Sequence, residues 1–325
     1  MAWLTFRRTY SSRTAYTGSM TDVTRVGIIG TGWVGSSVAI STLHAGLAQE
    51  LLLHDVRTAI AEGEAMDLAH GAAFYPAATV RQVSLDEMRA TDAVVIAAGR
   101  GGRAGESRLD LARDNARAVR EIASRFRDYA GVIVVVTNPV DVLTYEVAAT
   151  SGLPHERVIG TGTMLDTARL RQVVGSTLHV APQSIHAQVV GEHGDSEVVL
   201  WSSARAAGVT LGHWPAWSAN LETEIAGQVR RAAYEVIQRK GATNHAIGLV
   251  TAALLKALLR GENRVLTVSR VQDGALGLKD LALSLPAIVG ANGAAQVVEP
   301  ELSREERDRL QHSADVLRQA IASLA

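Results

Sequence analysis

A glycine-rich turn near the start of the chain constrains the fold more than any other feature of this sequence. The apolar run Val26–Ile29 is followed by the segment GTGWVG, residues 30–35, and a helical pattern then extends over Val34–Ala45. Gly30, Gly32 and Gly35 permit a tight turn, a close approach of the backbone to a pyrophosphate, and close packing of helix on strand. Free N–H groups and the positive end of the helix dipole would face the phosphates. The segment therefore predicts a strand–turn–helix unit that binds a dinucleotide.

An acidic residue at the end of the next predicted strand completes this pattern. Asp55 follows the apolar run Leu51–His54 and comes 20 residues after Gly35. A carboxylate there can bind both ribose hydroxyls of an adenosine and would repel a 2′-phosphate, so the pattern favours NAD over NADP. We assign Trp33 and Val34, at the helix start, to the same cofactor site. The alternative is a structural turn beside a solvated aspartate, and the register of all the parts disfavours it.

Short apolar runs alternate with helical patterns through the rest of the first half. Further strands are predicted at Ala93–Ala97 and Val132–Thr137, and further helices over Ala59–His70 and Asp110–Arg127. Buried strands that alternate with helices indicate parallel strands joined by right-handed crossovers. We therefore predict an α/β fold class, with a doubly wound parallel Rossmann sheet over residues 23–160.

The second half, residues 161–325, has a different pattern. Helices are predicted over Ala216–Lys240 and His245–Leu259, and an amphipathic helix from Ser303 onward. The runs Val265–Val271 and Ala275–Leu278 are predicted to be the two strands of an antiparallel pair. These elements indicate an α+β substrate domain. Because no low-complexity linker separates the halves, we expect them to pack tightly.

Composition excludes several classes of function. The net charge of −1 gives no support to a nucleic-acid or membrane-surface partner, and no apolar stretch approaches the roughly 18 residues of a membrane span. The absence of cysteine rules out disulfides and thiolate chemistry and is compatible with a reducing compartment. Residues 1–22 are set apart as an N-terminal extension, disordered or artificial, because the first 20 are basic, hydroxyl-rich and free of acids. An organelle-targeting role for residues 1–20 is the alternative to a cytoplasmic protein that starts at Met20.

Two motifs in the second half carry side chains suited to proton transfer and carboxylate binding. His193 lies in GEHGDSE, residues 191–197, and GTGTMLDTARLR, residues 160–171, places Asp166 and Arg169 three residues apart on one helix face. A histidine can carry a proton near neutral pH, the aspartate could orient it, and the arginine could hold a carboxylate. Each residue alone has the plainer interpretation of a surface or core position. No metal site is expected, since His193 and Asp195 have no third ligand at suitable spacing.

Six motifs in this order and spacing resemble the lactate/malate dehydrogenase family. They are GTGWVG, LLLHD, AAGRGGRAGESRLDL, VVTNPVDVLT, GTGTMLDTARLR and GEHGDSE. The resemblance extends from about Val23 to the end of the chain, and it is stronger to bacterial L-lactate dehydrogenases than to malate dehydrogenases. It implies reversible hydride transfer between NADH and pyruvate, giving (S)-lactate and NAD⁺. A malate or relaxed-specificity L-2-hydroxy-acid dehydrogenase is one alternative, and a non-catalytic NAD-binding protein is another.

The resemblance also implies a role for each residue of the motifs. His193 would be the acid/base that protonates the carbonyl oxygen of the substrate, and Asp166 would hold its ring and stabilise the imidazolium. Arg169 would bind the substrate carboxylate through two parallel hydrogen bonds. Arg108 would polarise the carbonyl group, and Asn138 would help to place substrate and nicotinamide. A cation and a proton donor are needed because hydride transfer builds negative charge on oxygen.

The segment AAGRGGRAGESRLDL, residues 97–111, resembles the lid loop of this family. The resemblance implies that Gly99, near its start, contacts the cofactor. Six residues before Arg108 the family carries glutamine in lactate enzymes and arginine in malate enzymes, whereas this chain has Gly102. Without arginine there, closure over a second carboxylate would bury an unpaired charge, unless Arg103 or a neighbouring arginine reached inward. Thr243 matches the usual substrate-pocket threonine of lactate enzymes. We therefore expect a small neutral 2-oxo acid, with tolerance of longer ones.

Two further expectations concern assembly and regulation. Bacterial relatives are typically homotetramers, and many bind fructose 1,6-bisphosphate at a subunit interface through one arginine and one histidine. The matching positions are Arg171 and His186. A doubly phosphorylated sugar there would neutralise a cationic cluster and favour one quaternary state. The alternative is that both residues only face solvent or stabilise the interface.

Overall fold

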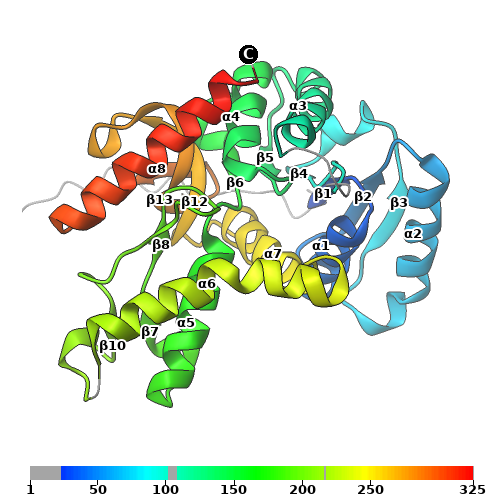
Figure 1. Ribbon diagram of the computed structural model, residues 1–325. Helices are drawn as coiled ribbons and strands as arrows, with labels where there is room; N and C mark the ends of the chain where they lie inside the picture. The colour runs from blue at the N-terminus through cyan, green and yellow to red at the C-terminus, as the bar shows by residue number, and fades with distance from the viewer. Residues whose placement is uncertain (1–22, 102–107, 216, 325) are drawn as a thin grey trace, which may run out of the picture.

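The computed structural model describes residues 23–101, 108–215 and 217–324 (Figure 1). Its centre is a nine-stranded sheet with the strand order β14-β13-β12-β6-β5-β4-β1-β2-β3. The first six strands in the chain pair in parallel, in the order 3-2-1-4-5-6. This confirms the predicted doubly wound Rossmann sheet. These strands are β1 (Arg25–Ile29), β2 (Glu50–His54), β3 (Thr79–Gln82), β4 (Ala93–Ile96), β5 (Val132–Val135) and β6 (Val158–Gly160).

The second half extends the same sheet with antiparallel strands. Gly160 of β6 bridges to Ser269 of β12 (Arg264–Asp273), which pairs along its length with β13 (Lys279–Gly290). β14 (Gly293–Val297) forms the edge. Two small sheets lie outside it and consist of β7 (Ile185–His186), β8 (Val189–Val190), β9 (Val198–Val199), β10 (Arg205–Ala206) and β11 (Val209–Thr210). The substrate half is therefore an α+β unit, as predicted.

Helices cover both faces of the sheet and connect its strands. Figure 1 shows α1 and α2 beside the blue and cyan strands and α8 at the opposite side of the molecule. The α-helices are α1 (Trp33–His44), α2 (Thr58–His70), α3 (Arg108–Ser124), α4 (Val140–Ser151), α5 (Met164–Leu178), α6 (Ala219–Lys240), α7 (His245–Leu259) and α8 (Arg304–Ala322). Short 3₁₀ turns are η1 (Ala72–Phe74), η2 (Glu87–Ala90), η3 (His155–Arg157), η4 (Pro182–Ser184), η5 (Leu211–His213) and η6 (Ala275–Gly277).

One predicted strand is wrong. The run Ala275–Leu278 forms the η6 turn, and the second strand of the pair begins only at Lys279. Positive φ angles of 122° at Gly274 and 79° at Gly277 reverse the chain direction, and the N–H of Gly274 donates to the Leu278 carbonyl. The apolar residues in this run thus belong to a hairpin turn, where glycine supplies backbone conformations that other residues rarely adopt.

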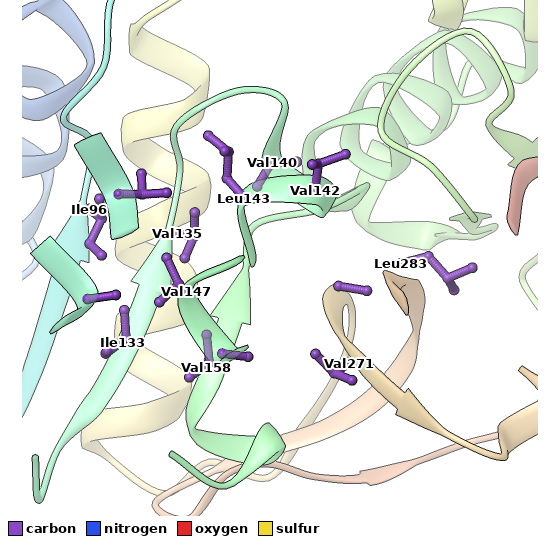
Figure 2. Close-up of a cluster of buried hydrophobic side chains, with 14 of the residues drawn as sticks. Ile96, Ile133, Val135, Val140, Val142, Leu143, Val147, Val158, Val271 and Leu283 are labelled. Carbon is purple, nitrogen blue, oxygen red and sulfur yellow. The ribbon is translucent and has the colours of Figure 1, made fainter. Parts of the chain in front are cut away.

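The core is continuous across both halves of the chain. Ile133 and Val135 of β5 pack on one face of the sheet, where the buried cluster reaches Val271 and Leu283 of the antiparallel strands (Figure 2). Val134, between the first two, packs on the other face. Burial of alternate residues on both faces is what a parallel sheet covered by helices requires. The shared core fixes the positions from which the functional side chains project.

Candidate functional site

The glycine turn after β1 has two positions that the fold itself requires to be glycine. Gly30 has a φ of +93°, and a Cβ atom there would lie 2.5 Å from the Ala98 backbone. A Cβ atom at Gly35 would lie 1.8 Å from the Gly30 carbonyl oxygen. Both contacts are far inside van der Waals distance. Glycine at 30 therefore lets the end of β1 lie against the segment after β4, and glycine at 35 lets α1 begin against the Gly30 carbonyl.

Gly32 differs from its neighbours because it borders open space. It is the N-cap of α1, and a Cβ atom there would meet nothing within 4 Å. The helix start has no side-chain cap and no acidic residue in its first turn. Trp33 is 60% exposed beside it, and Val34 is partly buried. Uncapped N–H groups with room in front of them fit the pyrophosphate of a dinucleotide.

Asp55 lies at the end of β2, directly beside this turn. Its carboxylate accepts hydrogen bonds from the Thr31 N–H at 2.9 Å and the Arg57 N–H at 3.0 Å. Burial raises the pKa of Asp55, but the backbone N–H groups of Arg57 and Thr31 outweigh burial and hold the pKa below its ordinary value. The carboxylate is therefore ionised at neutral pH and remains a strong acceptor for hydroxyl groups.

Asn115 of α3, which the sequence patterns did not indicate, connects the segment after Gly99 to Asn138. Asn115 of α3 is buried; its side chain accepts from the Arg100 N–H at 3.0 Å and donates to the Asn138 carbonyl at 2.9 Å. A Cβ atom at Gly99 would lie 2.4 Å from the Thr137 methyl group. Asn115 thus ties the end of β4 to the start of α4. In the sequence, the only signal for Asn115 is that it follows a glycine-rich segment.

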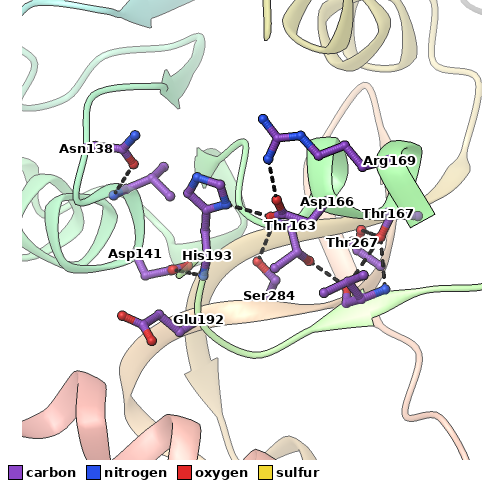
Figure 3. Close-up of polar contacts among 12 residues, drawn as sticks. Asn138, Asp141, Thr163, Asp166, Thr167, Arg169, Glu192, His193, Thr267 and Ser284 are labelled. Carbon is purple, nitrogen blue, oxygen red and sulfur yellow. Dashed lines mark hydrogen bonds and ion pairs between the residues drawn. The ribbon is translucent and has the colours of Figure 1, made fainter. Parts of the chain in front are cut away.

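His193, Asp166 and Arg169 meet in the second half (Figure 3). The His193 Nδ1 lies 2.5 Å from one carboxylate oxygen of Asp166, and Arg169 Nη1 donates to the other at 2.9 Å. Asp166 is buried in the first turn of α5, with Arg169 one turn later on the same face. The predicted i,i+3 relation therefore holds, and a single carboxylate orients both cationic groups.

The electrostatics of this cluster favour a protonated ring. Burial lowers the pKa of His193, but the adjacent Asp166 carboxylate outweighs this and raises the pKa to about 9. Burial likewise raises the pKa of Asp166, while the charge of His193, the hydrogen bond to it and Arg169 lower it below its ordinary value. The ring is thus poised to donate a proton through the nitrogen that does not face Asp166.

Two further acidic residues beside this cluster were missed. Asp141 in the first turn of α4 accepts the backbone N–H of His193 at 2.7 Å. Glu197 is buried at the cavity wall, where burial and the neighbouring Asp166 raise its pKa to about 8. Both residues lie within motifs of the family, NPVD and GEHGDSE. Their contacts are with residues distant in the sequence, and such contacts produce no periodic pattern.

The cluster opens into a cavity of about 710 Å³. Asn138, Asp166, Arg169 and His193 line it together with apolar residues of α3, α6 and α8. A smaller cavity of about 110 Å³ is lined by Thr243, Asn138, Arg169 and His193, and by Val34 at the start of α1. The nucleotide turn and the proton-transfer cluster therefore border a common space, which is large enough for a small organic acid.

Three predicted positions are not placed with their side chains. Gly102 and Arg103 lie outside the described residues, and Arg108 begins α3 but its side chain is outside them too.

The pair Arg171 and His186 lies away from the His193 cavity. Arg171 Nε donates to the Ala187 carbonyl at 3.0 Å, and the residue lines a separate cavity of about 290 Å³.

The described residues contain no helix of the length and apolarity that crossing a bilayer requires. Within the same residues, histidine and acidic side chains form no group of three or more that could hold a metal ion.

Comparison with known proteins agrees with this geometry. Residues 24–160 match the family model described as lactate/malate dehydrogenase, NAD binding domain, and residues 163–325 match its alpha/beta C-terminal domain. The L-lactate dehydrogenase of Bacillus caldolyticus is 44% identical over 306 residues, covering 92% of this chain and 96% of that enzyme. That of Synechococcus sp. (strain JA-3-3Ab) is 42% identical, covering 91% and 98%. The ligand-bound structure of the minor L-lactate dehydrogenase from Enterococcus mundtii superposes with a TM-score of 0.91 at 37% identity, covering 93% and 99%. The chain belongs to the lactate/malate dehydrogenase family.

Proposed function

We propose that this chain is an NAD-dependent L-lactate dehydrogenase that interconverts pyruvate and (S)-lactate. The observation that carries the proposal is the meeting of His193, Asp166 and Arg169 at one cavity with Asn138. Full-length similarity to several L-lactate dehydrogenases supports it. NAD is the cofactor of the family domain matched by the first half. A non-catalytic NAD-binding protein has no physical need for a half-buried histidine that a carboxylate orients in such a place.

The residues divide the work of reduction between them. When bound, NADH supplies the hydride that reduces the carbonyl carbon. His193 donates its proton from the nitrogen facing away from Asp166, and Asp166 stabilises the imidazolium before transfer. Arg169 binds the substrate carboxylate, because a planar guanidinium matches its two oxygens. On the family resemblance, Arg108 polarises the carbonyl group.

The other assigned residues place the two reactants. The turn of Gly30, Gly32 and Gly35 with Trp33 and Val34 holds the pyrophosphate side of the dinucleotide, and Asp55 holds its ribose. Gly99 and Asn138 lie near the nicotinamide end, and Thr243 borders the substrate. Three features support these assignments: the uncapped start of α1 for the pyrophosphate, the ionised Asp55 carboxylate for the ribose, and the cavity lined by Asn138 and Thr243 for the substrate.

A panel of 2-oxo acids tests this function. NADH oxidation is followed with pyruvate, oxaloacetate, 2-oxobutyrate and phenylpyruvate at one enzyme concentration. We expect pyruvate to have the highest kcat/KM and 2-oxobutyrate to be accepted, because Gly102 leaves space at the selecting position. A higher kcat/KM for oxaloacetate would replace this proposal with a malate dehydrogenase.

We further propose two structural units, residues 23–160 for the nucleotide and 161–325 for catalysis, assembled as a homotetramer. The change from parallel to antiparallel pairing after β6 supports the division. Exposed apolar side chains on α2 and η1 support the assembly, since Ile60 is 45% exposed, Met66 61% and Phe74 87%. Such side chains gain free energy by burial against a second copy. Analytical ultracentrifugation checks the mass, and Met66→Glu should lower it.

Fructose 1,6-bisphosphate is proposed as an activator that binds Arg171 and His186. Burial and the nearby charge of Arg264 lower the pKa of Arg171, so like charges face one another there. His186 is exposed in β7, next to the residue whose carbonyl Arg171 contacts. A phosphate would relieve this repulsion. The test is the pyruvate saturation curve with and without the sugar; an unchanged curve and no calorimetric binding would end the proposal.

A cytoplasmic location is proposed on the absence of cysteine, which suits a reducing compartment. Residues 1–22 lie outside the described residues. Fractionation of cells carrying the full chain and a variant starting at Met20 tests whether the first 20 residues redirect it.

A further inference from the structure

Two buried polar atoms in the wall of the His193 cavity lack hydrogen-bond partners. They are Oε1 of Glu197, just before β9, and Nε of Arg230, in the middle of α6, and neither has a partner among the described residues. Glu197 is only 5% exposed, and both side chains line the cavity of about 710 Å³. A buried polar atom without a partner costs free energy, so proteins satisfy nearly all of them with protein, water or ligand. This carboxyl and this guanidinium therefore indicate a polar ligand group in the cavity.

The inner face of α6 connects this pair to the substrate. Arg230, Ala233 and Ile237 lie three and four residues apart, so they share one face of the helix, and all three line the large cavity. Ala233 and Ile237 also line the smaller cavity, together with Thr243 and His193. Arg230 lies about 4.5 Å further along the helix axis than Ala233. A substrate two heavy atoms longer than pyruvate spans this distance with one hydrogen bond of about 2.9 Å.

We propose that Glu197 and Arg230 form a polar subsite for the side chain of the 2-oxo acid, which binds a hydroxyl or carboxamide group three atoms beyond the carbonyl carbon. The inference rests on the proposed dehydrogenase function and deepens it, because it names the class of longer substrate. The guanidinium only donates hydrogen bonds, whereas the carboxyl group accepts them. A hydroxyl or carboxamide group has both a donor and an acceptor and can satisfy both protein atoms. A methyl group in the same place would leave both unpaired.

The charges around Glu197 favour a neutral ligand group. Burial and the neighbouring Asp166 raise the pKa of Glu197 to about 8. The nearby cations Arg230, His193 and Arg169 act in the opposite direction and do not offset this. The carboxyl group is thus mostly protonated at neutral pH, so it can donate as well as accept. Because the ionised Asp166 lies nearby, a second substrate carboxylate would be repelled, whereas a hydroxyl or carboxamide group would not.

Two pairs of substrates with matched shapes isolate the hydrogen bond. The first pair is 4-hydroxy-2-oxobutyrate and 2-oxopentanoate, and the second is 2-oxosuccinamate and 4-methyl-2-oxopentanoate. Within each pair only the polar group differs, while the carboxylate and the carbonyl group are the same. An effect on proton transfer from His193 therefore cancels in the ratio of the two kcat/KM values. This ratio is measured at pH 7 and saturating NADH.

Four variants assign the ratio to particular side chains. Glu197→Leu and Arg230→Met each remove one polar group at similar volume, whereas Glu197→Gln keeps a donor and an acceptor. Arg231→Met is the matched control, because Arg231 is exposed on the same helix and does not line this cavity in the described part of the chain. Thermal midpoints and NADH affinity are measured alongside, so that a folding defect is recognised.

We expect the polar member of each pair to have a kcat/KM at least about tenfold higher in the wild type, because a site with buried polar groups rejects an analogue that leaves them unpaired. The ratio should fall to about twofold or less in Glu197→Leu and Arg230→Met. It should stay near the wild-type value in Glu197→Gln and Arg231→Met. Equal kcat/KM values within the wild-type pairs, or one ratio in all the variants, would overturn the subsite and leave ordered water as the partner of both atoms.

Binding without turnover separates this inference from the proposed function. Calorimetry measures (S)-2,4-dihydroxybutyrate and (S)-2-hydroxypentanoate against the enzyme saturated with NADH, where no hydride can move because ligand and cofactor are both reduced. We expect the dihydroxy acid to bind about tenfold more tightly, and this difference to disappear in Arg230→Met. Equal affinities in the wild type overturn the subsite. If no 2-oxo acid is reduced but the difference in affinity is present, the proposed function alone fails.

Discussion

The nucleotide turn and the proton-transfer cluster differ in what binds the ligand: the turn offers backbone N–H groups, and the cluster offers charged side chains. The turn is made of backbone atoms within a single strand–turn–helix unit, with Gly32 facing open space. The cluster is made of charged side chains: Asp166 pairs with both His193 and Arg169, and Asp141 of α4 accepts the main-chain N–H of His193. A site made of uncharged backbone needs only room, whereas a buried charged site must balance its charges before any ligand arrives.

The largest expected effect tests whether the two sites are separable. His193→Ala removes the proton donor and leaves the turn intact, so pyruvate reduction should fall by about 10²–10⁴-fold while NADH affinity persists. Steady-state kinetics measures the loss of pyruvate reduction, and NADH fluorescence titration measures the NADH affinity. His213→Ala, an exposed histidine in η5, is the matched control. Most activity remaining in His193→Ala would remove it from the mechanism.

The pH dependence sharpens the comparison, because the proton donor His193 belongs to the cluster and not to the nucleotide turn. Pyruvate reduction needs protonated His193, whose pKa is raised to about 9. Its kcat/KM should be constant well below that pH and fall about tenfold per unit above it. Lactate oxidation needs the neutral ring, so its kcat/KM should rise toward the same pH. NADH affinity should change little over the range, and a profile centred near the ordinary histidine pKa would contradict the assigned environment.

A pair of glycine substitutions breaks the comparison from the other side. Gly32→Ala should fold normally, since its Cβ atom meets no neighbour, but weaken NADH binding at least about tenfold by entering the space in front of α1. Gly35→Ala should instead destabilise the protein by about 3 kcal/mol, because its Cβ atom collides with the Gly30 carbonyl. Thermal melts and NADH titrations of both variants separate the effects. Equal NADH affinity in Gly32→Ala and wild type would argue against a pyrophosphate there.

The smallest expected effect concerns substrate choice. Gly102→Gln should raise the ratio of pyruvate to oxaloacetate kcat/KM about fivefold, and Gly102→Arg should lower it, because arginine pairs with a second carboxylate. Gly101→Gln is the matched control, since Gly101 is exposed and a Cβ atom there meets nothing within 4 Å. If Gly101→Gln shifts the ratio as much as Gly102→Gln does, residue 102 is not the selecting position.

The sequence alone predicted the elements that local patterns encode. The Gly30 turn, the parallel strands and the α5 helix face shared by Asp166 and Arg169 all follow from period and spacing, and the structure has them. Residue roles came from family resemblance. Asp141 and Asn115 could not be found in this way, because each acts through a partner far along the chain. The run Ala275–Leu278 was misplaced because its apolar composition hides a turn that flanking glycines produce.

The bridge between Gly160 and Ser269 has a consequence for how far the two halves can be treated as modules. A Cβ atom at Gly160 would lie 3.0 Å from the Ser269 Cβ atom across the bridge and 2.3 Å from the Thr144 hydroxyl, so this seam is closely packed. Production of either half alone would expose β6 or the ten-residue β12 as an unpaired edge, which is a template for aggregation. A chimera that exchanges catalytic halves between relatives would therefore stay monodisperse only if Gly160, Thr144 and Ser269 were transferred as one matched set.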